Sequence, residues 1–338
     1  MTGYGALLKK RRLAEKANAL ARDISMLILN NIVFEAIIIV ALGLCYLFTT
    51  TFDRLFNTRL RRSFTSWMQR ISADNLNVLR REQIRYIFKR KYGLKKIKIK
   101  LAGGSYWISI PCVVKGVDKK THAEKKYMAK IINDRSTLKH KYLTMMRNFG
   151  LMAERRPLKF EEHRNPREMG EFERQCLVGM RRSSANAPEV YGLHHLGADD
   201  YMLVMDFIEG RPLSDMDIDS KMLDDVFQAL KSIHEGGVYH GDIKLDNFIF
   251  SNGKVFVFDC LKLDTKGEQA AAFDLACLLC ALAEKVPVNV ILEHARRHFS
   301  AGELKLAADM IDLALYKSDL ELSADKVGEL MQGLRVTP

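Results

Sequence analysis

The stretch around Asp242 constrains this chain of 338 residues more than any other feature. It reads VYHGDIKLDN from Val238 to Asn247, which puts Asn247 five positions after Asp242. Asn252 and Gly253 follow between two apolar runs and predict a tight hairpin, because both turn positions need positive φ. That hairpin ends at Asp259. A loop carboxylate and amide, followed by a hairpin that delivers a second carboxylate, indicate a Mg²⁺-nucleotide site, since Mg²⁺ prefers one or two protein oxygens alongside phosphate oxygens and water.

The sequence before this stretch predicts the strands that would accompany such a site. Lys126–Ile132 reads as a strand with Lys130 pointing inward. Further upstream, Ile97–Leu101 alternates and runs into a short glycine turn at Gly103 and Gly104. A buried strand beginning at 201 leaves through Asp206 and Phe207, and an amphipathic helix over 221–234 leads directly into the Asp242 loop.

Taken in order, these motifs resemble those of the protein-kinase-like superfamily, over about residues 95 to 300. The loop matches H-x-D-x-K-x-x-N, and the strand with Lys130 matches V-A-I-K. The resemblance implies an α+β, two-lobed fold with a small β-rich N-lobe over 93–205 and a helical C-lobe over 206–338. It also implies an ATP- and Mg²⁺-dependent phosphotransferase that moves the γ-phosphate to a hydroxyl.

The resemblance also implies a role for each matching residue. Asp242 would orient the attacking hydroxyl and accept its proton, and Lys244 would neutralise charge on the transferred phosphoryl group. Asn247 and Asp259 would hold Mg²⁺. The residues implied in ATP binding are Gly103, Gly104, Lys130, Glu173, Asp206 and Ile208.

Within that set, Lys130 would pair with the α- and β-phosphates and be held by a glutamate on a helix. Glu173 is the expected partner, 43 residues further on, which makes the basic segment 133–167 an insertion. Glu154, Glu161 and Glu162 are the alternatives.

Several departures narrow the resemblance. Gly241 stands where regulated kinases carry an arginine, Cys260 and Leu261 replace Phe-Gly, and no A-P-E occurs. The chain is similar to the compact atypical branch: RIO-type kinases, the small kinases of KEOPS-type complexes and bacterial lipopolysaccharide (Kdo-type) kinases. A Ser/Thr protein kinase is the leading expectation. A lipid- or lipopolysaccharide-sugar-directed kinase and a membrane-tethered pseudokinase scaffold are the alternatives.

The N-terminal third carries most of the positive charge. Residues 1–100 hold 21 Lys and Arg against 6 Asp and Glu, within a net charge of +12 for the chain. We divide this third into a basic segment (1–25), an apolar helix (26–48) and basic amphipathic linker helices (49–92). The pattern predicts association of residues 1–92 with an anionic membrane surface through a single-pass or in-plane helix, with the kinase domain cytoplasmic. No nucleic-acid motif accompanies the charge, so nucleic acid is not an expected partner.

Overall fold

The structure is a computed structural model, and the description below covers part of the chain. The residues described are 41, 44, 45, 48, 76, 78–102, 108–153, 158–197, 200–265, 267–315, 320 and 322–335. The chain divides into two compact units, Met1–Phe64 and Thr65–Pro338. The fold and the site described below belong to the second unit.

The membrane-associated localisation predicted from the sequence is wrong on the evidence of the described residues. Among them, no helix is both long enough and apolar enough to cross a membrane. The apolar segment 26–48 lies outside the described residues except for four positions, as does most of the linker 49–92. What the chain does show of that linker is one helix, α4 (Val78–Lys91), which packs on the sheet instead.

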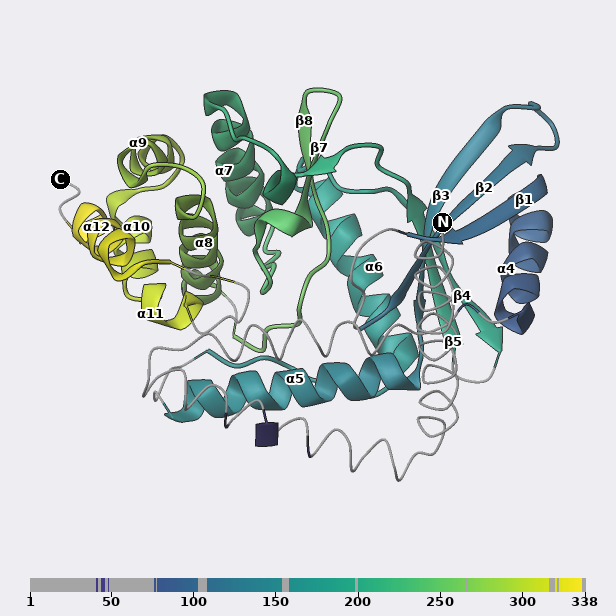
Figure 1. Cartoon of the computed structure of the whole chain (residues 1–338), viewed down its shortest axis with the longest axis horizontal. Helices are drawn as coiled ribbons and strands as arrows, with labels where there is room; N and C mark the ends of the chain where they lie inside the picture. Colours follow the sequence, from purple (N-terminus) through teal and green to yellow (C-terminus); the bar gives the residue numbers. More distant parts are fainter. Residues whose placement is uncertain are drawn as a thin grey trace, which may run out of the picture. The chain divides into compact units, whose positions relative to one another are not determined.

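One antiparallel sheet of five strands forms the sheet lobe (Figure 1). Its strands lie in the order β1-β2-β3-β5-β4, with bounds β1 (Leu94–Leu101), β2 (Ile110–Asp118), β3 (Glu124–Ile132), β4 (Val190–Gly197) and β5 (Asp200–Asp206). β3 lies in the middle, and its alternating pattern buries Ala129 and Ile131. Ile84 and Phe88 of α4 are fully buried in the same apolar cluster. The central position of β3 therefore holds Lys130 on a strand that is paired on both sides.

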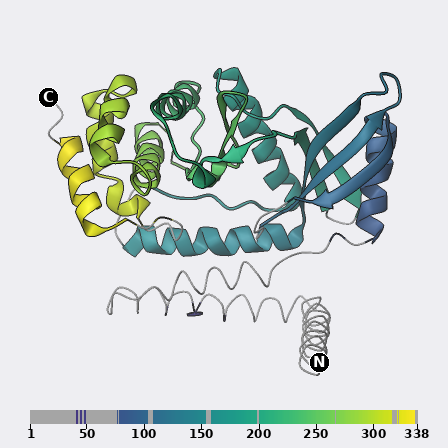
Figure 2. The same ribbon diagram turned by 45° about the horizontal axis from the view of Figure 1, so that its top comes forward.

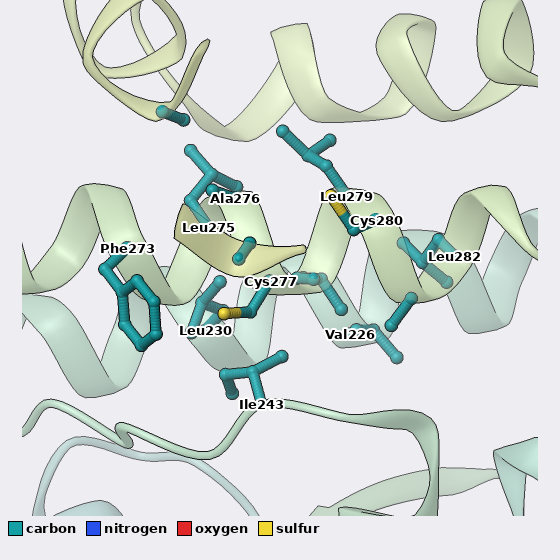
Figure 3. Packing of buried hydrophobic residues seen from close by; sticks show 14 of the residues in the cluster. Val226, Leu230, Ile243, Phe273, Leu275, Ala276, Cys277, Leu279, Cys280 and Leu282 are labelled. Atoms are coloured by element: carbon teal, nitrogen blue, oxygen red, sulfur yellow. The ribbon is translucent and has the colours of Figure 1, made fainter. Parts of the chain in front are cut away.

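Helices make up the other lobe, which we call the helical lobe. They are α7 (Ser220–Glu235), α8 (Glu268–Ala283), α9 (Val288–His298), α10 (Ala301–Ala308), α11 (Ile311–Ala314) and α12 (Ala324–Arg335). α8 is apolar nearly all round and is buried among the others. Figure 3 shows its side chains, Cys277 included, beside Leu230 of α7 and Ile243 of the Asp242 loop. The loop is therefore seated directly on the core of this lobe.

A small three-stranded sheet lies against α7 of the helical lobe. It consists of β6 (Arg211–Pro212), β7 (Phe248–Ser251) and β8 (Lys254–Val257), and short 3₁₀ turns precede β7 at Leu213–Asp215 and Leu245–Asn247. Between β7 and β8 the chain turns at Asn252 and Gly253, whose φ angles are +50° and +75°. The hairpin predicted from the sequence is confirmed, and β8 leads into Asp259.

Two further helices lie between β3 and β4: α5 (Asp134–Ala153) and α6 (Pro166–Arg182). In both Figure 1 and Figure 2, α5 runs along one side of the unit from the sheet toward the helical lobe. α6 has a strong start signal: Asn165 is its N-cap, with its side-chain oxygen accepting the Glu168 N–H at 2.8 Å, and Pro166 occupies the first turn. This cap fixes where the helix that carries Glu173 begins.

Replacing Asn165 by alanine is expected to lower the free energy of unfolding by about 1 kcal/mol, because the Glu168 N–H loses its acceptor. Urea unfolding followed by circular dichroism measures this loss. Asn165→Asp keeps an acceptor oxygen at the same place and serves as the control. Equal stability of the alanine and aspartate variants would contradict the assigned cap.

Candidate active site

Lys130 lies between two carboxylates contributed by different elements. Its Nζ is 2.8 Å from Glu173 Oε1 on α6 and 2.6 Å from Asp259 Oδ1 after β8. The Lys130 and Glu173 side chains are buried, at 15% and 8% exposed, whereas Asp259 is 46% exposed. Of the other glutamates considered, Glu161 pairs with Lys262, Glu162 is exposed and Glu154 lies outside the described residues. The structure thus pairs Lys130 with Glu173 across the 43-residue separation.

The three charged groups of this cluster shift one another's pKa values. Burial alone would lower the pKa of Lys130, but Asp259 and Glu173 outweigh it and raise that pKa. Burial raises the pKa of Glu173 more than the Lys130 ammonium lowers it. For Asp259, burial raises the pKa, but the charge and hydrogen bond of Lys130 together with the charge of Lys244 outweigh it, so the pKa falls. Lys130 is therefore held as a cation, and Asp259 as an anion.

The Asp242 loop is held in shape by its own hydrogen bonds. Asn247 Nδ2 donates to the Asp242 main-chain oxygen at 2.8 Å. His240 braces the loop as well: its Nε2 lies 3.0 Å from the Phe258 oxygen and its Nδ1 accepts the Asp242 N–H at 3.2 Å. Lys244 Nζ lies 3.4 Å from Asp242 Oδ2. The loop therefore presents Asp242, Lys244 and Asn247 as one unit, tied to the strand that leads to Asp259.

A buried carboxylate from α8 supports this loop from below. Asp274 is fully buried; its two oxygens accept the main-chain N–H groups of His240 at 2.6 Å and Gly241 at 2.8 Å. His234 of α7 also contacts it, at 3.2 Å. Sequence reasoning missed this role, for which the available signal is a single carboxylate within the apolar run of α8.

Gly241 is required by the backbone at its position. Its φ is +72°, and a Cβ there would lie 2.7 Å from the Leu261 oxygen. The strand-like contact between the Leu261 N–H and the His240 oxygen, 2.8 Å, brings the two segments this close. The glycine that stands here in place of the arginine of regulated kinases thus follows from the close approach of two backbone segments.

Asp259 and the residue after it also depart from ordinary geometry. Asp259 has φ +70°, a conformation that is uncommon for non-glycine residues, although aspartate tolerates it better than most. Cys260 follows and is buried against Cys176 of α6; contact with that thiol and burial raise its pKa, so it stays a neutral thiol. The small thiol occupies, beside α6, the position of the phenylalanine in Asp-Phe-Gly.

The remaining residues predicted to bind ATP are not part of the charged cluster around Lys130. Gly103 and Gly104 lie outside the described residues. Asp206 ends β5, and its carboxylate accepts the Tyr191 hydroxyl at 2.7 Å and the Glu189 N–H at 3.1 Å, which ties β4 to β5. Ile208 follows in the connection between the lobes and is half-buried.

Sequence reasoning missed the contribution of the insertion 133–167. Its helix α5 places Arg147 Nη2 3.6 Å from Asp242 Oδ1. After α5, the segment 158–163 (the strap) pairs with the chain that follows Asp259: Phe160 bridges to Leu263, and the Glu161 N–H donates to the Lys262 oxygen at 2.9 Å. No local sequence pattern indicates these contacts, because each joins residues that are far apart in the sequence.

Two buried histidines fasten the strap to α5. The rings of His140 and His163 lie 4.5 Å apart, and the His163 ring is 5.2 Å from Phe172, next to Glu173. Among the described residues, His163 Nδ1 has no hydrogen-bond partner. Burial lowers the pKa of His140 to about 3 and that of His163 to about 4, so both rings are neutral near pH 7.

These pKa values predict an acid-sensitive fold. In the unfolded chain a histidine takes up a proton below its ordinary pKa of 6.5, whereas folded His163 resists protonation until about 4. Stability is therefore lost as the pH falls from 6.5 toward 4, by about 2 kcal/mol at pH 5 for His163 alone. Urea unfolding at pH 7 and pH 5 should show a smaller difference for His163→Phe than for the wild type. His122→Asn, at an exposed position, serves as the control and should behave as the wild type does.

Asn247 and Asp259 fit Mg²⁺ by the chemistry of their donor atoms. Asn247 uses its amide nitrogen on the Asp242 oxygen, which leaves the amide oxygen as the end suited to a hard cation. Asp259 is anionic and partly exposed. Within the described ranges, no group of three or more His, Cys, Asp or Glu side chains could hold a metal. One carboxylate with an amide is the usual protein share when phosphate oxygens complete the shell.

The segment that contains the Asp242 loop is similar to known kinases. The model of the lipopolysaccharide core biosynthesis protein (WaaY) family matches residues 193–276, which include Asp242, Asn247, Asp259 and Asp274. The lipopolysaccharide core heptose(II) kinase WaaY of Escherichia coli (strain K12) is 33% identical over 73 residues, or 21% of this chain and 29% of the relative. The KEOPS complex subunit Bud32 of Pyrococcus abyssi (strain GE5 / Orsay) is 29% identical over 108 residues, or 30% of this chain and 46% of the relative.

Over the matched segments, the chain is similar to kinases of the protein-kinase-like superfamily. It spans less than half the length of either curated relative. Among solved structures, a protein assigned as a fructosamine-3-kinase from Haemophilus somnus 129PT aligns with a TM-score of 0.40 and 10% identity, covering 75% of this chain and 96% of that one. The antiparallel sheet and the helical lobe are those expected of a protein-kinase-like fold.

Proposed function

We propose that this chain is a phosphotransferase that moves the γ-phosphate of ATP to a hydroxyl group, with Mg²⁺. The observation that carries the proposal is that Lys130 of β3 lies 2.8 Å from Glu173 of α6 and 2.6 Å from Asp259, in a segment that is hydrogen-bonded to the Asp242–Asn247 loop. Phosphoryl transfer depends mostly on positioning and on neutralising charge, and this cluster supplies both.

Each residue has a defined task in this proposal. Lys130 would bind the α- and β-phosphates, with Glu173 holding its ammonium in place. Asn247 and Asp259 would hold Mg²⁺, which when bound neutralises charge on the phosphate oxygens. Asp242 would orient the acceptor hydroxyl and accept its proton, and Lys244, 3.4 Å away, would face the transferred group.

The acceptor is either a sugar hydroxyl or a Ser/Thr side chain. The relative with 33% identity is a heptose kinase, which supports a sugar. The strap supports a small acceptor too: it pairs with 262–264, and the Leu261 N–H is bonded to His240. The short stretch after Asp259 therefore offers little main chain to an extended peptide. The H-x-D-x-K-x-x-N loop supports the protein kinase. We favour the sugar.

Labelled ATP distinguishes these acceptors. Purified full-length protein is incubated with γ-labelled ATP, Mg²⁺ and a total extract of the source cells, and the products are separated into protein, lipid and polysaccharide fractions. Label in the polysaccharide or lipid fraction, absent with Asp242→Asn, supports the sugar-directed kinase. Label on serine or threonine supports the protein kinase. Absence of Asp242-dependent label from every fraction would favour a pseudokinase scaffold and contradict the proposal.

A further inference from the structure

Arg147 gives the Asp242 carboxylate a second cation that the kinase motifs do not supply. Lys244 Nζ lies 3.4 Å from Asp242 Oδ2, and Arg147 Nη2 lies 3.6 Å from Oδ1. The two cations therefore approach different oxygens of one carboxylate. Lys244 comes from the loop itself, whereas Arg147 comes from α5 in the insertion.

The position of Arg147 is set by contacts that do not involve Asp242. Its guanidinium lies over the Phe160 ring, 5.4 Å from the centroid. The adjacent residue, Asn148, clamps the main chain of Phe160, donating to its oxygen and accepting its N–H, both at 2.8 Å. Phe160 also packs edge-on against Phe273 of α8, at 5.9 Å. Arg147 is thus anchored to the strap and, through it, to the helix beneath the Asp242 loop.

The guanidinium retains capacity for a ligand. At 3.6 Å its approach to Asp242 is longer than a hydrogen bond, and its side chain is 29% exposed. Guanidinium carries five N–H donors in a planar fork, of which one carboxylate engages at most two. Donors therefore remain for a second oxyanion beside Asp242.

We propose that Arg147 binds an oxyanionic group of the acceptor, a phosphate or carboxylate close to the hydroxyl that receives the phosphoryl group. The inference rests on the proposed function, because the acceptor hydroxyl must reach hydrogen-bond distance of Asp242. An anionic substituent on a neighbouring carbon then comes within reach of a guanidinium 3.6 Å from the same carboxylate. The acceptor class is therefore an anionic hydroxyl compound, and Arg147 selects it by a bidentate contact.

Inorganic phosphate serves as the probe. The full-length protein is saturated with Mg²⁺ and a non-hydrolysable ATP analogue, so that the nucleotide site is filled, and phosphate is titrated by calorimetry. The wild type should bind it saturably, and Arg147→Gln should weaken binding about tenfold or more. Arg147→Lys should fall between them, because it keeps the charge and the contact with Phe160 but loses the fork. Arg164→Gln removes an exposed arginine close to the strap and should change nothing. Acetate, titrated in the same way, tells whether a carboxylate is accepted as well.

Nucleotide affinity, measured first, distinguishes failure of the proposed function from failure of the role proposed for Arg147. A wild type that binds no nucleotide contradicts the proposed function itself. Normal nucleotide binding together with no phosphate binding, or with the same phosphate affinity in Arg147→Gln, overturns the role of Arg147 alone. Weaker nucleotide binding by Arg147→Gln would place Arg147 on the nucleotide phosphates and overturn it as well.

Discussion

Asp242→Asn is expected to slow phosphoryl transfer by about 10²–10⁴-fold while leaving nucleotide binding unchanged, because an amide cannot accept the proton of the attacking hydroxyl. The substitution preserves the shape of the side chain. It also preserves the 2.8 Å bond from Asn247, which goes to the main-chain oxygen of Asp242, so the loop should keep its conformation. The initial rate of label transfer to the acceptor fraction measures the loss, and calorimetry measures the affinity for the nucleotide.

Asp246→Asn is the matched control for this loss. Asp246 belongs to the same loop, is exposed, and accepts the Ser214 hydroxyl at 2.5 Å. An asparagine keeps an acceptor there, so the rate should stay near that of the wild type. Equal losses in the two variants would mean that the loop as a whole had been disturbed, and the role assigned to Asp242 would then be wrong.

The largest effect on stability is expected from Asp274→Ala. The alanine would leave the His240 and Gly241 N–H groups buried without their acceptor, at about 1–3 kcal/mol each. A loss of about 2–6 kcal/mol is a large part of the stability of an ordinary domain. Because the same two N–H groups belong to the loop that presents Asp242, activity should fall with stability. Urea unfolding measures the first quantity and label transfer the second.

Asp264→Ala provides the comparison for Asp274. Asp264 is exposed, and its carboxylate lies 3.8 Å from an exposed lysine, Lys159, a type of pair that contributes about 0–1 kcal/mol. If Asp274→Ala proved as stable as Asp264→Ala, the assignment of Asp274 as the support of the loop would be contradicted.

The parts of the site that the sequence predicted are those encoded locally. The hairpin at Asn252 and Gly253 follows from two residues that tolerate positive φ, and it fixes where Asp259 emerges. The spacing from Asp242 to Asn247 is likewise closed by hydrogen bonds within the loop. Pairing of Lys130 with Glu173 spans 43 residues, and it could be anticipated only because the resemblance to kinases indicated which partner to look for.

The rest depends on tertiary contacts that no short pattern encodes. Arg147 looked like one more charge in a basic insertion, and only the clamp of Asn148 on Phe160 brings it to Asp242. Asp274 is one carboxylate in an apolar helix, and only the structure shows that it is buried against the loop and accepts two of its main-chain N–H groups. The membrane prediction was wrong for a different reason: it rested on the apolar segment 26–48 and its basic flanks, and among the described residues no helix is long and apolar enough to cross a membrane.

The central claim is that Lys130, Asn247 and Asp259 form one Mg²⁺-dependent nucleotide site, and its most direct test needs no knowledge of the acceptor. ATP binding is measured by calorimetry with and without Mg²⁺, for the wild type and for Lys130→Met and Asp259→Asn, with Lys126→Met, on the same strand, as the control. We predict that the wild type and Lys126→Met bind ATP saturably and only with Mg²⁺. The ATP affinity of Lys130→Met and of Asp259→Asn should be lower by about tenfold or more. Binding that ignores Mg²⁺, or that survives both substitutions, would contradict the claim.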